Sequence, residues 1–199
     1  MPRTGLSKEE IVAKAAELAN ERGLSYLSVT TLADHLGIKK PSLYNHIKTI
    51  EDMHKNLMIY GWRTVSEEIV KGIDTSDEKV NLLEYGNRFY HFAMENPGVF
   101  EAMLWYNKYS DDTLFSVTEG LYSFFFRQTD GLGIEREIAN HLLRTYRAFL
   151  EGFIMLRIHN SFGNAISMDE SFEVSMNVLI SGMEQYREEG ENKNGISTL

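Results

Sequence analysis

The side chains best suited to binding another molecule gather in the short segment from Gly37 to Ile50. This segment contains Lys39, Lys40 and Lys48 and no acidic residue. Lysine contacts phosphate groups as a point charge, and serine and tyrosine hydroxyls donate hydrogen bonds to phosphate oxygens. An asparagine amide can pair with the edge of an adenine base. We therefore interpret the segment as a candidate surface for a nucleic-acid duplex.

The distribution of charge along the chain favours this interpretation, although the formal net charge of the whole protein is -9. Residues 1–56 contain 8 Lys or Arg and 7 Asp or Glu, whereas the remaining residues contain 12 and 22. A phosphate backbone would be attracted to the first part and repelled by the rest, which would orient the protein on a duplex. Three lysines alone are equally typical of a solvated surface, so the interpretation depends on the elements that position them.

Capping and turn residues predict two short helices around the basic segment. Ser28 is a suitable N-cap for the first, and Gly37 can adopt the left-handed conformation that ends it. The second is expected over residues 41–46, because its first residue is a proline, whose missing N–H would have no partner there. Leu43 and Ile47 then face the core, and the polar residues point outward. Two short helices joined by a glycine-containing turn are typical of a helix-turn-helix, whose second helix enters the major groove.

The rest of the sequence is typical of amphipathic helices and has no convincing strand pattern. A capping box of Ser7 and Glu10 starts the first helix, which we expect to stop at Gly23. Later helices are expected near residues 51–72, 77–95, 97–108, 111–129, 134–162 and 168–188. The predicted fold is all-α, with a three-helix helix-turn-helix domain in residues 1–50, a larger helical ligand-binding and dimerisation domain in 51–190, and a flexible tail in 191–199.

The stretch VTTLADHLGIKKPSLYNHIKTIEDM resembles the DNA-binding segment of the TetR family of transcriptional regulators. Leu32-Ala33, Gly37, Leu43-Tyr44 and His46 fall in the register of the family, and the resemblance covers about residues 7–60. It implies that the segment from Lys40 to Lys48 lies at the DNA. Free N–H groups at a helix N-terminus also bind phosphate, which predicts a positioning role for Ser28 and Thr30. The candidate DNA-binding residues are Ser28, Thr30, Lys39, Lys40, Pro41, Ser42, Tyr44, Asn45, His46 and Lys48.

One residue departs from the family pattern. Where the family commonly has a lysine opening the fourth helix, this chain has Ile50, and Lys48 is the residue available to replace that phosphate contact. An ordinary helical hairpin in which Tyr44 and His46 only pack is the alternative interpretation of the whole segment.

Aromatic residues are concentrated in the larger part of the chain, since 13 of 23 lie between Tyr85 and Phe126. Most must be core, but large rigid rings also line ligand pockets, together with a few polar groups. The resemblance implies a small, often hydrophobic or aromatic effector in this region. Candidate ligand-binding residues, for each of which plain core packing is the alternative, are Asn87, Tyr90, His91, Met94, Met103, Trp105, Tyr106, Phe125, Tyr146 and Phe149.

The last two long helices have apolar residues on more than one face, which a single chain cannot cover. Ala148 and Gly152 would let two helix backbones approach closely. We therefore expect a homodimer with a four-helix interface, as in the family. Such a dimer spaces two recognition helices to meet successive major grooves of a palindromic operator.

The predicted function is sequence-specific transcriptional regulation. We expect the protein to repress transcription by binding a double-stranded DNA operator, and to leave the operator when a small-molecule effector binds. A regulator without an effector is one alternative and a small helical enzyme another. No catalytic residue, metal site or cofactor is expected, because the chain has no cysteine, its six histidines lack metal-ligand spacing and no glycine-rich phosphate loop occurs. No apolar run approaches the roughly 20 residues that span a bilayer, and no secretory signal pattern opens the chain. We expect a cytoplasmic protein with no membrane partner.

Overall fold

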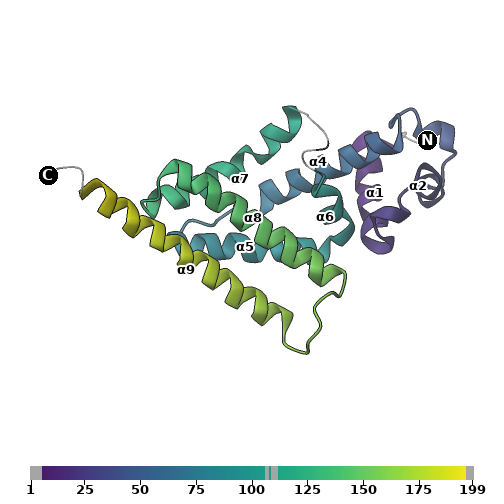
Figure 1. The fold of residues 1–199 in the computed structure, drawn as a ribbon. Helices are drawn as coiled ribbons and strands as arrows, with labels where there is room; N and C mark the ends of the chain where they lie inside the picture. The colour runs from purple at the N-terminus through teal and green to yellow at the C-terminus, as the bar shows by residue number, and fades with distance from the viewer. Residues whose placement is uncertain (1–5, 106–107, 109–111, 196–199) are drawn as a thin grey trace. The chain divides into compact units, whose positions relative to one another are not determined.

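The computed structural model describes residues 6–105, 108 and 112–195. These residues form α-helices and one 3-10 helix, and no β-strand occurs among them (Figure 1). The predicted all-α fold is confirmed. The chain divides into two compact units, of which the first contains residues 1–66 and 92–118 and the second contains residues 67–91 and 119–199. This division differs from the predicted domains 1–50, 51–190 and 191–199, which stay a prediction.

The first unit carries the N-terminal helices. Its elements are α1 (Lys8–Arg22), η1 (Leu24–Tyr26), α2 (Val29–Leu36), α3 (Lys40–Leu43), most of α4 (Ile50–Glu68) and α6 (Pro97–Met103). The start of α1 confirms the predicted capping box, because the Ser7 hydroxyl accepts from the Glu10 N–H at 3.1 Å and the Glu10 carboxylate accepts from the Ser7 N–H at 2.6 Å. The helix ends as predicted at Gly23, whose φ of 87° lies outside the helical region.

The helices α1 and α6 are packed directly backbone to backbone. A Cβ atom added to Gly98 in α6 would lie 2.1 Å from the carbonyl oxygen of Ala19 in α1, so only glycine fits there. The side chain of Asn20 holds the joint, since its Oδ1 accepts from the Val99 N–H at 3.0 Å and its Nδ2 donates to Asn96 Oδ1 at 2.9 Å. The N-terminus of α6 is therefore attached to the C-terminal end of α1 by both shape and hydrogen bonds.

The second unit contains the longest helices. Its elements are most of α5 (Glu78–Glu95), most of α7 (Asp112–Gly131), α8 (Arg136–Ile158) and α9 (Met168–Gly195). Aromatic rings fill its core: Tyr146 is fully buried, packs against Phe125 and donates its hydroxyl to the Leu82 carbonyl oxygen at 2.6 Å. Burial raises the pKa of Tyr146, so the phenol is kept neutral. No described helix is long and apolar enough to cross a membrane.

Several helix ends differ from the prediction. The α4, α6 and α8 helices end earlier, at Glu68, Met103 and Ile158, whereas α9 continues past residue 188 to Gly195. The end of α6 has a tertiary cause, because the indole N–H of Trp62 donates to the Met103 carbonyl oxygen at 3.2 Å. This hydrogen bond joins residues 41 positions apart, too distant in sequence for a periodic pattern to reveal.

Candidate nucleic-acid interface

The turn between α2 and α3 has the geometry of a Schellman motif. Gly37 adopts the left-handed conformation with φ 64° and ψ 30°. Its N–H donates to the Asp34 carbonyl at 3.1 Å, and the Ile38 N–H donates to the Ala33 carbonyl at 3.0 Å. This pair of bonds satisfies the carbonyls at the end of α2 and sets the direction in which the chain leaves the helix. The predicted role of Gly37 is confirmed.

The recognition segment is shorter than predicted as a helix. The α3 helix covers Lys40–Leu43 and is followed by turns at residues 44–46, instead of continuing to His46. The turns still coil in the helical sense, since the Ile47 N–H donates to the Leu43 carbonyl at 3.1 Å. Leu43 and Ile47 are both completely buried, and they hold the segment to the core at two points one turn apart. The side chains between these two anchors are consequently presented to solvent.

The predicted DNA-binding side chains of this segment lie on the surface. Tyr44 is 52% exposed and is therefore not a core residue. His46 is half-buried, so part of its surface does pack. The exposed residues are Lys39, Lys40, Pro41, Ser42, Tyr44, Asn45 and Lys48. Their contact with DNA stays a prediction.

The Ser28 and Thr31 hydroxyl groups at the N-terminus of α2 form hydrogen bonds that cap the helix. The Ser28 hydroxyl accepts from the Thr31 N–H at 3.1 Å, and Thr31 Oγ1 accepts from the Ser28 N–H at 2.9 Å. Ser28 is half-buried, whereas Thr30 is exposed in the first turn. A phosphate at this helix end would therefore be bound by the backbone N–H groups and Thr30 rather than by the capping hydroxyl of Ser28.

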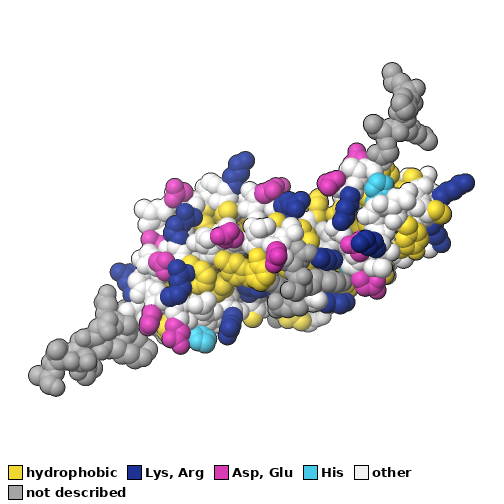
Figure 2. Space-filling model, turned by 90° about the horizontal axis from the view of Figure 1, so that it is seen from above, with side chains coloured by type: hydrophobic (Ala, Val, Ile, Leu, Met, Phe, Trp, Pro, Cys, Tyr) yellow, Lys and Arg dark blue, Asp and Glu magenta, His cyan; other side chains and the backbone are white. Residues whose placement is uncertain are grey.

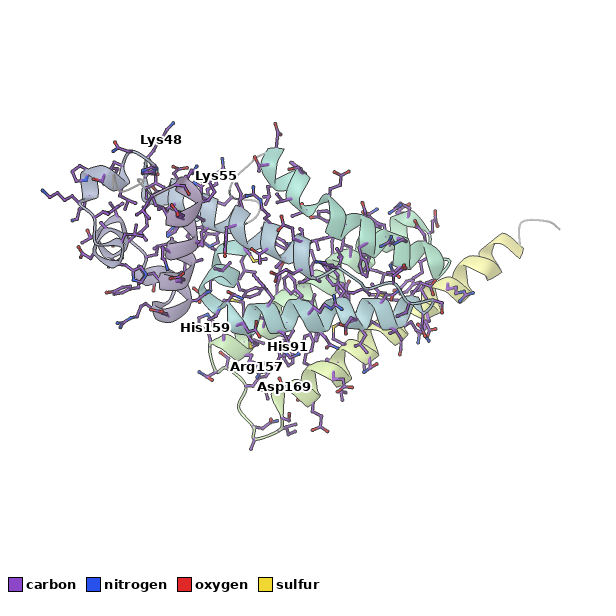
Figure 3. The ribbon with its side chains drawn as sticks, turned by 180° about the vertical axis from the view of Figure 1, so that it is seen from behind. Lys48, Lys55, His91, Arg157, His159 and Asp169 are labelled. Carbon is purple, nitrogen blue, oxygen red and sulfur yellow. The ribbon has the colours of Figure 1, made fainter. Side chains whose placement is uncertain are left out.

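Two side-chain to backbone hydrogen bonds fix the backbone of Lys48 and Thr49 at the start of α4. The Thr49 hydroxyl accepts from the Asp52 N–H at 3.1 Å and so caps the helix, and Asp52 Oδ2 accepts from the Lys48 N–H at 3.0 Å. Lys48 and Lys55 both lie at this N-terminal end of α4 (Figure 3). Ile50 is half-buried, in accord with an apolar role at the position where the resemblance led us to look for lysine.

Electrostatic contacts bring one further basic residue to the start of α4. The Lys108 ammonium lies 4.2 Å from the centre of the Trp105 ring, which meets the His54 ring edge-to-face at 5.0 Å. Burial lowers the pKa of His54, and the charge of Lys108 lowers it further. Hydrogen bonds from its own backbone and Thr49 lower the pKa of Glu51, with a contribution from Lys108. Several Lys and Arg side chains are visible over the N-terminal helices in Figure 2. Sequence spacing gave no signal for Lys108.

The predicted ligand-binding residues do not form one set. Asn87, Tyr90, His91, Phe125, Tyr146 and Phe149 belong to the second unit, whereas Met94, Met103 and Trp105 belong to the first. Tyr106 lies outside the described residues. His91 is exposed, and Tyr146 uses its hydroxyl inside the core. The Tyr90 ring stacks on Phe172 at 4.1 Å, and its hydroxyl donates to Asp169 Oδ1 at 2.7 Å. Ligand contact by any of these residues stays a prediction.

Two family models match this chain. The model of bacterial regulatory proteins of the tetR family matches residues 11–56, and the model of the tetracyclin repressor-like C-terminal domain matches residues 82–179. The chain belongs to the TetR family. As a TetR-family member it is a DNA-binding transcriptional regulator with a helix-turn-helix, and it is not an enzyme. The predicted family is thereby confirmed.

Individual relatives agree with this assignment. The chain is 28% identical over 183 residues to the uncharacterised HTH-type transcriptional regulator YobS of Bacillus subtilis, covering 92% of this chain and 95% of that protein. A TetR variant of Acinetobacter baumannii in complex with minocycline has a TM-score of 0.73 at 21% identity, with 92% and 98% of the two chains covered. The TetR-family protein ActR of Streptomyces coelicolor in complex with actinorhodin has a TM-score of 0.70 at 14% identity, with 92% and 98% covered. The two solved structures share the TetR fold with this chain.

Proposed function

We propose that this TetR-family protein is a cytoplasmic repressor that binds a palindromic operator as a homodimer and leaves it when a small, largely hydrophobic or aromatic effector binds. The observation that carries the proposal is the exposed row of basic, hydroxyl and amide side chains on the segment held by Leu43 and Ile47. A rigid backbone below such a row keeps its side chains at fixed spacing, and sequence-specific contact with base edges requires that spacing.

Different residues of this row have different tasks. Lys40 is the first residue of α3 and is exposed, so its ammonium group is available to contact a DNA phosphate. Asn45 is exposed one turn later and offers an amide, which can bind adenine through two hydrogen bonds. Phosphate contacts position a protein on the duplex, whereas base contacts specify the sequence. Variants of the two residues should therefore change two different measurable quantities.

The test is selection of bound fragments from random duplex DNA, followed by titrations of the selected operator at several salt concentrations. In Lys40→Gln we expect the slope of log affinity against log salt to fall in magnitude by about 2, because each subunit of the dimer loses one phosphate contact. In Asn45→Ala we expect an unchanged slope and a loss of roughly 1–3 kcal/mol at the affected base pair. Lys79→Gln is the matched control, because Lys79 lies on α5 and pairs with Glu184 at 3.0 Å. If Lys40→Gln behaves like Lys79→Gln, the proposed DNA-binding row is wrong.

The homodimer is supported by the outer face of α8 and α9. Leu156 on α8 is 47% exposed, and Val174 and Val178 on α9 are 59% and 69% exposed. Gly152 and Gly182 lie within the same helices, and a Cβ atom added to either would meet nothing within 4 Å. A mid-helix glycine costs roughly 1 kcal/mol relative to alanine, and nothing in the fold of one chain requires these two. Close approach of a second copy would explain both the glycines and the exposed apolar residues.

We expect Val178→Glu to convert the dimer to a monomer at micromolar concentration, because two carboxylates would be buried in a two-fold apolar interface. Sedimentation equilibrium measures the mass, and far-ultraviolet circular dichroism checks that the helices are retained. Val80→Glu is the control, since Val80 is 48% exposed on α5 and should tolerate the charge. A wild-type monomer, or a dimer that Val178→Glu leaves intact, would exclude this interface.

An effector is supported by the aromatic content of the second unit and by the minocycline and actinorhodin complexes of the two structural neighbours. The rings of Tyr90, Phe149 and Phe153 surround Phe172 at centroid distances of 4.1, 5.8 and 5.3 Å. The selected operator fragment supplies the assay: a panel of hydrophobic aromatic compounds is scored for release of the labelled fragment and for a rise in thermal midpoint. Repression itself is tested by placing the operator between a promoter and a reporter gene.

A further inference from the structure

Lys108 is brought to the start of α4 by tertiary structure alone, since it lies 54 positions after His54 in the sequence. Its ammonium lies 4.2 Å from the centre of the Trp105 ring. The same ring meets His54, one turn into α4, at 5.0 Å between centroids. Trp105 therefore places Lys108 beside the first turns of α4. The cation–π attraction between the ammonium group and the indole ring favours this position of the lysine side chain.

The fourth helix opens with Ile50 instead of the expected lysine, and Lys48 supplies one cation there. The Asp52 carboxylate accepts hydrogen bonds from the Lys48 N–H and from Asn56 Nδ2, each with a donor–acceptor distance of 3.0 Å. Glu51 remains as an exposed acid at the same helix end, where it would repel a phosphate. Hydrogen bonds from its own backbone and from Thr49 lower the pKa of Glu51 most, and the positive charge of Lys108 adds a smaller contribution in the same direction.

We propose that Lys108, held on the Trp105 ring beside the start of α4, contacts a DNA phosphate at the flank of each operator half-site. Lys108 is itself exposed at the surface. The contact adds charge but no base recognition, so it strengthens binding to any duplex sequence. This inference rests on the proposed function, because it assigns one more residue to the same DNA-binding surface.

The test repeats the salt titration with Lys108→Gln, using the selected operator and an unrelated duplex. We expect several-fold weaker binding to both at low salt and a slope reduced in magnitude by about 2 for the dimer. The thermal midpoint should change little, because Lys108 is exposed and substitution of an exposed side chain seldom alters stability appreciably. Lys79→Gln again serves as the control.

A double-mutant cycle with Glu51→Gln separates a phosphate contact from simple neutralisation of Glu51. If Lys108 contacts phosphate, Lys108→Gln lowers the slope in the Glu51→Gln background as well. If Lys108 only neutralises Glu51, the slope in that background stays unchanged, and the inference is overturned. A normal response of Lys40→Gln with no response of Lys108→Gln would overturn this inference alone. Failure of the wild-type protein to bind any duplex would overturn the proposed function and this inference together.

Discussion

Replacement of Gly98 by alanine is expected to lower the free energy of unfolding by roughly 1–3 kcal/mol, the usual cost of overpacking. The added Cβ atom would lie 2.1 Å from the carbonyl oxygen and 2.3 Å from the carbonyl carbon of Ala19. Both are backbone atoms of α1, so no side-chain rotation relieves the clash, and α6 must move away from α1. That movement also weakens the bond from the Val99 N–H to Asn20 Oδ1. Thermal unfolding should show a midpoint lowered by about 2–4 °C for each kcal/mol.

The control for this variant is alanine at another helical glycine. A Cβ atom added to Gly120 in α7 would meet nothing within 4 Å. Gly120→Ala should therefore stabilise the protein by up to about 1 kcal/mol, because alanine is the better helix former. Opposite signs for the two variants are expected from geometry alone. Equal effects, or a Gly98→Ala protein as stable as the wild type, would show that α1 and α6 are not in contact at this point.

Phe172→Ala is expected to destabilise the protein by about 3–5 kcal/mol, the range for a buried phenylalanine. Phe172 is almost completely buried at the start of α9. Its ring stacks on Tyr90 at 4.1 Å and meets Phe153 at 5.3 Å, so it joins α9 to α5 and α8. Removal of the ring leaves a cavity and also loosens the segment that carries Asp169, which accepts hydrogen bonds from Tyr90 and Arg157 (Figure 3). Urea unfolding measures the loss.

Phe115→Ala provides a comparison with the same change in side chain at an exposed site. Phe115 on α7 is 65% exposed, and its truncation should alter the free energy of unfolding by no more than about 0.5 kcal/mol. The difference between the two variants isolates the contribution of burial. Similar effects of both substitutions would mean that the ring cluster around Phe172 does not stabilise the second unit.

Much of the DNA-binding part could be predicted because its determinants are local. The caps of Ser7, Ser28 and Thr49 each join atoms three residues apart, and the turn at Gly37 needs only a left-handed backbone. Interactions of this range are present in any window of sequence that contains both partners. Burial of Leu43 and Ile47 followed from the same spacing. The outward direction of Lys40 and Asn45 is a direct consequence of these local features.

The ligand-binding prediction used composition instead of spacing and was correspondingly less specific. A concentration of aromatic residues between Tyr85 and Phe126 does not say which rings share a neighbourhood. Trp105 and Tyr146 fall into different compact units, and His91, a predicted polar ligand contact, is exposed. Side-chain type predicts a tendency to be buried, but partners in a core are chosen by the three-dimensional path of the chain.

The amino-acid sequence by itself determined the helical class, the helix-turn-helix and the surface that presents its basic side chains, because each depends on residues within about one helical turn of one another. Tertiary structure alone decided the joint between Gly98 and Ala19, the early end of α6 at Met103 and the position of Lys108 beside His54. Each of these features joins atoms that are separated by forty or more residues of the chain, and no periodic pattern records which distant residues the folded backbone brings into contact.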